Sequence, residues 1–250
     1  MAGHSKWANI KHRKAASDAK RSRIFTRVLK EITVSARHGG GDPAGNPRLR
    51  QAIQEARNHN VPNDTIDRAV KKGTGELEGQ NLEELSYEGY GPGGVAVLVE
   101  TVTDNKNRTV GEVRHLFSRY GGNLGENGCV SWMFDKRGMF LVDASGLDEE
   151  EFMELALEVG AADFSTEEEG YQILTAPEDY LSTLEQLQQR EEVSMLGSQL
   201  ALLPQNTVTV DEQTAPQVLQ LVEALEEHDD VQHVWSNYDI PPELAEQYGG

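Results

Sequence analysis

Residues 21–37 read RSRIFTRVLKEITVSAR, and this stretch decides how the first part of the chain folds. Its apolar side chains recur every three or four residues, at Ile24, Phe25, Val28, Leu29 and Ile32. Such spacing predicts a helix with one apolar stripe that packs into a core. The basic side chains of the same stretch fall together on the opposite side, because successive helical residues are rotated by about 100°. That side fits a polyanion, and a solvated helix face is the ordinary alternative.

The distribution of charge along the chain favours the polyanion. The whole protein has a net charge of −19. Residues 1–72, however, hold 16 Lys and Arg against 6 Asp and Glu, a net charge of +10. Residues 73–250 hold 7 against 36, a net charge of −29. This asymmetry indicates a basic nucleic-acid-binding unit joined to acidic domains.

The basic unit is predicted to be a small helical bundle over residues 1–72. Residues 1–12 have the sequence of an arm, and the first helix ends at the glycine-rich stretch 39–43. Asn46 is expected to cap a second helix that has Pro47 at its first position. A third short helix spans 63–72, and 73–81 is a linker rich in Gly and Glu.

The hydrophobic pattern then changes to that of strands and short helices. A strand is expected at 94–102, a helix at 107–120 and a second strand at 129–134. The chain continues with a strand at 139–142, a helix at 148–159, strands at 161–165 and 171–175, a helix at 177–190 and a strand at 199–203. This second series has the βαββαβ order of ferredoxin-like domains.

The C-terminal region is too short to form a core alone. It supplies a strand at 207–210, a helix at 215–227 and a strand at 231–236. Joined to 82–134 these would complete a second βαββαβ unit. We therefore predict an α+β multidomain fold in which 135–204 is inserted into a domain made of 82–134 plus 205–240, with 241–250 as a tail. Two sequential domains with a C-terminal appendage are the alternative.

One polar stretch of the acidic part, 103–109 (TDNKNRT), joins a strand to a helix. Asp104 or Asn105 is a natural helix cap, but the nearby basic residues could also extend the phosphate-binding surface. The two roles are compatible. The residues that we expect to contact nucleic acid are Lys6, Trp7, Lys11, Arg13, Lys14, Lys20, Arg23, Arg27, Lys30, Arg37, Arg48, Arg50, Lys106, Arg108 and Arg114.

No catalytic constellation can be assigned from spacing, and we expect no enzyme activity, cofactor or metal. The glycine-rich stretches 90–94 and 121–128 are interpreted as turns, because neither lies between a strand and a helix N-terminus. His228 and His233 could suggest a metal, but no second ligand cluster supports one. Cys129 is interpreted as a small core residue within a strand.

A single cysteine excludes an internal disulfide and fits a reducing compartment. No apolar run is long enough to span a membrane, and the basic N-terminus lacks the hydrophobic segment of a secretory signal. The sequence therefore predicts a cytoplasmic protein with no membrane partner.

Several stretches resemble one known family. They are MAGHSKWANIKHRK at the start, GGGDP at 39–43, NPRLRQAI at 46–53, YEGYGPGGVAV at 87–97, TDNKNRT at 103–109 and GGNLG at 121–125. Together they are similar to the YebC family of bacteria, which has a mitochondrial branch. The resemblance is dense over the first 140 or so residues. Val61 and Asn63 stand where the family pattern has Met and Lys.

The resemblance implies a helical N-terminal domain and two α+β domains, one inserted in the other, without catalytic activity. It also implies either of two roles, a DNA-binding transcriptional regulator or a ribosome-associated translation factor. The acidic body favours rRNA in a ribosome, where the acidic faces could meet ribosomal proteins. Promoter DNA remains the alternative partner, and a hydrolase with a hidden site is a third hypothesis.

Overall fold

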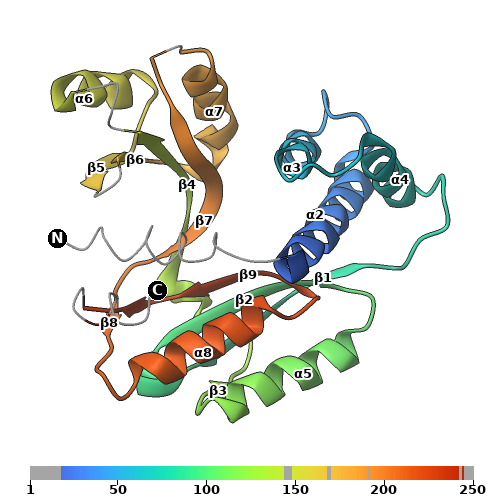
Figure 1. Cartoon of the computed structure of the whole chain (residues 1–250), viewed down its shortest axis with the longest axis vertical. Helices are drawn as coiled ribbons and strands as arrows, with labels where there is room; N and C mark the ends of the chain where they lie inside the picture. The colour runs from blue at the N-terminus through green and yellow to red at the C-terminus, as the bar shows by residue number, and fades with distance from the viewer. Residues whose placement is uncertain (1–17, 144–147, 168–169, 191, 242–243, 245–250) are drawn as a thin grey trace. The chain divides into compact units, whose positions relative to one another are not determined.

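The computed structural model describes residues 18–143, 148–167, 170–190, 192–241 and 244 (Figure 1). They form two compact units, one of residues 132–207 and one of residues 18–131 together with 208–241 and 244. Each unit has cores of its own and is described separately. Within the described ranges, none of the helices combines the length and the hydrophobicity that a membrane span needs.

The second of these units begins with three helices, α2 (Asp18–Gly39), α3 (Pro47–Asn58) and α4 (Asn63–Thr74). Ile32 of α2 and Leu49 of α3 are fully buried in their shared core. Gly73 of α4 lies so close to α2 that an added Cβ would come within 2.3 Å of the Thr33 carbonyl oxygen. The predicted helical region is therefore confirmed.

Asn46 joins the end of α2 to the start of α3. Its Oδ1 accepts a hydrogen bond from the Leu49 N–H at 3.1 Å, which satisfies one of the unpaired donors of the first turn of α3. Its Nδ2 donates to the carbonyls of Ser35 at 2.7 Å and Gly40 at 2.8 Å. The predicted cap is confirmed, and the same side chain also closes the C-terminus of α2.

A four-stranded antiparallel sheet follows, in the order β3-β1-β2-β9. Its strands are β1 (Glu83–Tyr90), β2 (Ala96–Thr103), β3 (Asn123–Leu124) and β9 (Val231–Ser236). The helices α5 (Lys106–Arg119) and α8 (Ala215–Glu226) pack side by side on one face of this sheet (Figure 1).

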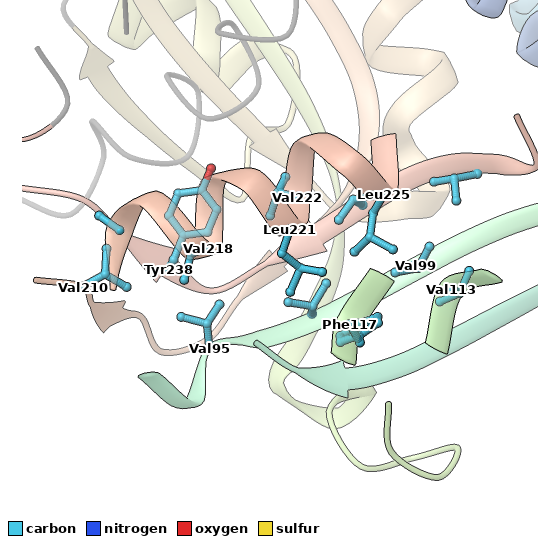
Figure 2. Packing of buried hydrophobic residues seen from close by; sticks show 14 residues of the cluster. Val95, Val99, Val113, Phe117, Val210, Val218, Leu221, Val222, Leu225 and Tyr238 are labelled. Carbon is cyan, nitrogen blue, oxygen red and sulfur yellow. The ribbon is translucent and has the colours of Figure 1, made fainter. Parts of the chain in front are cut away.

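The core between this sheet and its helices is built from both ends of the sequence. Val99 of β2, Phe117 of α5 and Leu221 of α8 lie in one buried cluster (Figure 2). Val231 and Val234 of β9 are also fully buried there. Because β9 pairs directly with β2, this sheet is built from two segments of the chain, one that ends before residue 104 and one that begins after residue 230.

Two of the four strands predicted for this sheet, 129–134 and 207–210, do not belong to it. Residues 129–133 form a turn and the 3₁₀ helix η2 (Ser131–Met133), and Phe134 begins a strand of the other unit. The place beside β2 is taken by β1, which the sequence pattern did not reveal. Val208–Thr209 (β8) pairs with Tyr238–Asp239 (β10) in a separate two-stranded parallel sheet.

Residues 134–204 have the predicted βαββαβ order. The elements are β4 (Phe134–Asp143), α6 (Glu149–Glu158), β5 (Asp163–Glu167), β6 (Gly170–Thr175), the 3₁₀ helix η4 (Pro177–Asp179) with α7 (Tyr180–Gln188), and β7 (Met195–Pro204). The sheet order is β5-β6-β4-β7 with every pair antiparallel. This is the ferredoxin-like arrangement.

The core of this unit is aromatic, with Phe140 stacked on Tyr180 and Phe152 on Tyr171. The α+β multidomain fold class is confirmed. The domain boundaries at 72, 82, 135 and 205 stay a prediction.

Candidate nucleic-acid interface

The predicted contacts of the N-terminal arm, Lys6, Trp7, Lys11, Arg13 and Lys14, lie outside the described residues. Lys20 belongs to the first turn of α2. The remaining predicted contacts lie on α2, α3 and α5. Several of these side chains form hydrogen bonds or ion pairs with other groups of the protein.

Lys30 of α2 is directed at the edge of the sheet. Its ammonium donates to the Val102 carbonyl at 3.1 Å, the Asp229 carbonyl at 2.9 Å and the Asp230 carboxylate at 2.7 Å. An ammonium has three N–H donors, so these three oxygens take all of them. In this arrangement Lys30 has no donor left for a phosphate.

Asp230 collects partners from three parts of the chain. Besides Lys30, its carboxylate accepts hydrogen bonds from Arg108 at 2.7 Å, Thr109 at 2.8 Å and Thr103 at 3.2 Å. Burial acts to raise the pKa of Asp230, but these donors, Lys30 and Arg108 above all, hold the pKa well below the usual range of a carboxyl group. Through these contacts the Asp230 carboxylate ties α2 and α5 to the sheet.

The segment 103–109 acts as a helix cap. The Oδ1 of Asn105 accepts a hydrogen bond from the Arg108 N–H at 3.1 Å. The Arg108 guanidinium pairs with Asp104 at 3.0 Å and with Asp230 at 2.7 Å. Capping is thus confirmed, and Arg108 belongs to the Asp230 cluster.

Three further predicted contacts have partners within the protein. Arg23 pairs with Glu227 at 2.8 Å. Arg37 donates to the Leu82 carbonyl at 2.7 Å and thereby holds the start of β1. Arg48 pairs with both Glu31 and Glu84. Partial burial acts to lower the pKa of Arg48, but the two carboxylates raise it above its ordinary value.

Arg27 is half-buried on α2 and Arg50 is exposed on α3. Lys106 and Arg114 are exposed on α5, and neither forms an ion pair with any residue that the structure describes. These two are the predicted contacts of the α+β part that remain directed at solvent.

A second group of basic residues was missed from the predicted set. Arg68, Lys71 and Lys72 of α4 are exposed and form no ion pair within the described ranges. Arg57, at the end of α3, is likewise exposed and forms no ion pair with a described residue. The spacing of 68, 71 and 72 is that of one helix face, so the periodicity that revealed α2 could also have found this group. We call Arg68, Lys71 and Lys72 the α4 basic patch.

His228 lies beside the Asp230 cluster. Its Nε2 is 2.8 Å from Glu112 Oε2, and its Nδ1 accepts the Asp230 N–H at 3.1 Å. Glu112, His228 and Asp230 bring ligand-type atoms within 4.8 Å of one another. A metal ion there would have to displace Lys30 and Arg108 from Asp230, so the donor set does not fit one. His233 instead stacks on Trp235.

The glycine-rich stretch after β1 is a turn, as predicted, since Pro92–Gly94 form a short 3₁₀ turn between β1 and β2. Cys129 is half-buried and lies in a turn, so its placement in a strand is wrong. Burial and the nearby Glu88 carboxylate raise the pKa of the Cys129 thiol. A raised pKa keeps the thiol protonated, which disfavours a nucleophilic role.

Comparison with known proteins assigns most of the chain to one family. Residues 5–76 match the TACO1/YebC protein N-terminal domain, and residues 82–238 match the TACO1/YebC second and third domain. The chain belongs to the TACO1/YebC family. The resemblance inferred from the sequence motifs is thereby confirmed.

The TACO1/YebC relatives are similar to this chain over nearly its entire length. A probable transcriptional regulatory protein of Magnetococcus marinus is 55% identical over 246 residues, which cover 98% of each chain. One from Geobacter sulfurreducens is 52% identical and covers 99% of each. The crystal structure of a conserved hypothetical protein from Aquifex aeolicus matches with a TM-score of 0.86 at 49% identity, over 96% of this chain and 99% of that one.

Proposed function

We propose that this TACO1/YebC protein is a non-enzymatic regulator of gene expression that binds nucleic acid through its helical N-terminal part. The observation that carries the proposal is the net charge of +10 in residues 1–72 against −29 in the rest. The names of the relatives, probable transcriptional regulatory proteins, support the same class of function.

Within residues 1–72, the α4 basic patch is the best-placed candidate for phosphate contact among the described residues. Arg23, Lys30 and Arg48 neutralise carboxylates of the protein, whereas the patch has exposed basic groups with no described ion-pair partner. Lys and Arg that meet phosphates release counterions, so binding should weaken with salt. The arm residues and Trp7 are proposed to add charge and base stacking.

Structured rRNA is the first candidate target. An acidic body of −29 opposes long wrapping of duplex DNA. A site in a ribonucleoprotein lets the basic part face phosphate while acidic faces meet protein or solvent. Promoter DNA is the second candidate, and the names of the relatives favour it. The two targets differ in a measurable way, because a transcriptional regulator needs sequence-specific readout.

The test of nucleic-acid binding is a salt titration with the triple variant Arg68→Ala/Lys71→Ala/Lys72→Ala. Loss of three duplex phosphate contacts should reduce the slope of log K against log salt by up to about 2.7. The matched control, Lys136→Ala/Arg137→Ala/Arg190→Ala, removes three positive charges from residues 134–204 and should leave the slope unchanged. Equal slopes for wild type and the α4 variant would refute the patch.

The test of the target is competition between ribosomes and promoter-containing duplex at matched phosphate concentration and near-physiological salt. We expect ribosomes to win, and Trp7→Ala to weaken RNA binding by more than its lack of charge suggests, since stacking contributes about 1–3 kcal/mol per base. Preference for one DNA sequence over random duplex and over ribosomes would make transcription the primary role.

A further inference from the structure

One face of α2 meets oxygen atoms of residues 82–131 and 208–240, which we call the sheet part. Three basic side chains share this face because they are seven residues apart, and seven residues make nearly two helical turns. They are Arg23, Lys30 and Arg37. In turn they meet the Glu227 carboxylate, the Asp230 carboxylate and the Leu82 carbonyl. A row of cations on one helix thus faces a row of oxygen atoms on the sheet part.

Ion pairs join the sheet part to the helices α2, α3 and α4, which we call the bundle. Besides the three contacts of α2, Arg48 of α3 pairs with Glu84 of β1. In each of these four contacts the basic group belongs to the bundle and the oxygen to the sheet part. Among the residues that the structure describes, the hydrophobic cores of the bundle and of the sheet part have no member in common. The two are therefore held together by charge rather than by a shared core.

The most buried of these ion pairs, Lys30 with Asp230, can separate without leaving a buried charge uncompensated. When Lys30 leaves, Asp230 keeps its hydrogen bonds from Arg108 and Thr109, which belong to the sheet part. The Lys30 ammonium itself returns to water. Separation restores the hydration of the charge that leaves, whereas a substitution removes one charge and strands its partner. Another anion can therefore take the place of Asp230 beside Lys30.

The connection between the bundle and the sheet part allows them to separate. Residues 75–82 join α4 to β1 and belong to neither a helix nor a strand. Residues 75–81 are exposed. An extended chain of this length spans up to about 26–29 Å. The bundle can thus move away from the sheet part while each keeps its own core.

We propose that the basic face of α2 is a phosphate-binding surface that the sheet part covers, and that a nucleic-acid backbone replaces the carboxylates there. From Arg23 to Arg37 this face extends about 21 Å, since each helical residue rises about 1.5 Å. A nucleic-acid backbone offers anionic oxygens at regular intervals along such a length. Arg and Lys would give these oxygens the same charge-assisted hydrogen bonds that they now give to Glu227 and Asp230.

The α4 basic patch is exposed while the face of α2 is covered, so it provides the first contact with the nucleic acid. The identity of the ligand rests on the proposed function. The separation of the bundle from the sheet part does not, because high salt should produce it without any ligand.

The first test measures binding of the full chain to an RNA duplex of random sequence. Glu84→Gln/Glu227→Gln removes one exposed carboxylate from Arg48 and one from Arg23. Exposed ion pairs are weak, so losing two of them should raise the population of the open bundle, and with it the affinity, by about 2- to 30-fold. A purely structural role of these pairs predicts no gain in affinity beyond that of a charge-matched control.

That control is Glu212→Gln/Glu223→Gln. It removes two exposed carboxylates of the sheet part that form no ion pair with a described residue. It therefore reports the general effect of two fewer negative charges. Equal affinities of the two double variants, with wild type also binding the duplex, would overturn the proposal and leave the proposed function standing.

The second test measures the opening by electron paramagnetic resonance between two spin labels. The labels are attached at Gln54→Cys in α3 and Gln220→Cys in α8, two exposed positions, in a chain that carries Cys129→Ser. At low salt we expect one distance. Bound duplex, or KCl at about 1 M, where the Debye length is about 3 Å, should add a second and broader population. A distance that stays unchanged under both conditions would overturn the proposal. A distance that changes with salt in a chain that binds neither RNA nor DNA duplex would refute the proposed function instead.

Discussion

Asp230 and Lys30 are separated by 200 positions in the sequence and by 2.7 Å in the structure. Asp230 is 3% exposed, and its partners Lys30 and Arg108 carry the positive charge that offsets its burial. Removing one partner of a buried pair costs about 3–5 kcal/mol, because the other charges remain without compensation. We therefore expect Asp230→Asn to lower the free energy of unfolding by about 3 kcal/mol, measured by urea denaturation at pH 7.

The control for this variant is Asp104→Asn, which removes an exposed carboxylate from the same Arg108. Its cost should stay below about 0.5 kcal/mol, the usual range for surface pairs. The pH dependence gives a second check. Since folding lowers the pKa of Asp230, its stabilisation is complete above the unfolded value of about 3.9 and is lost as pH falls toward the folded value. The gap between wild type and Asp230→Asn should narrow from pH 7 to pH 3; a constant gap would contradict the assignment.

At the scale of elements, Glu88 of β1 holds the segment that leads out of the first sheet. Its buried carboxylate accepts hydrogen bonds from the N–H groups of Gly128 and Val130 at 2.8 Å and of Ser131 at 2.7 Å. Burial acts to raise the pKa of Glu88, but these donors lower it below the ordinary value. Glu88→Gln replaces one acceptor oxygen by an amide donor facing N–H groups, so the segment should open more easily.

Limited chymotrypsin digestion measures that opening, because the exposed Trp132 lies directly after the held segment. Leaving a buried donor unsatisfied costs about 1–3 kcal/mol, so cleavage at Trp132 should be about 5 to 160 times faster in Glu88→Gln. Glu83→Gln, at the exposed start of the same strand, should digest like wild type. Equal rates in the two variants would show that Glu88 does not hold the segment.

Local signals predicted the elements that depend on local chemistry. The Asn46-Pro47 pair correctly predicted the start of α3. The strand at 231–236 has the predicted bounds. The mostly apolar sequence of residues 129–134 is typical of a strand. In the structure, however, the N–H groups of Val130 and Ser131 donate to the Glu88 carboxylate and are not available for hydrogen bonds to a neighbouring strand. The strand β1 (EELSYEGY) contains residues that rarely favour strands, and it is placed by pairing with β2.

The candidate site was harder to predict than the fold. Net charge located the basic segment, yet charge alone could not separate Lys30, which meets Asp230, from Lys71, which faces solvent. That distinction depends on contacts between residues some 200 positions apart, which no local pattern encodes.

At the scale of the whole molecule, the two ends of the segment 134–204 lie next to each other. Phe134 pairs with Pro204, and the Gln205 N–H donates to the Met133 carbonyl at 2.8 Å. Adjacent antiparallel strands place paired Cα atoms about 4.5–5.5 Å apart, so two or three Gly/Ser residues can join 133 to 205. Among the residues that the structure describes, none from 134–204 belongs to the core around Phe117 and Leu221.

We therefore expect a chain with 134–204 replaced by a short Gly/Ser linker to keep a cooperative unfolding transition. Residues 82–134 alone should remain unfolded, because β2 would lose β9 and the core would lose α8. Circular dichroism and urea denaturation of the two proteins measure this difference. A well-folded 82–134 fragment, or a linker variant without a cooperative transition, would contradict the insertion, since each would mean that the sheet does not depend on the two ends of the chain as its pairing implies.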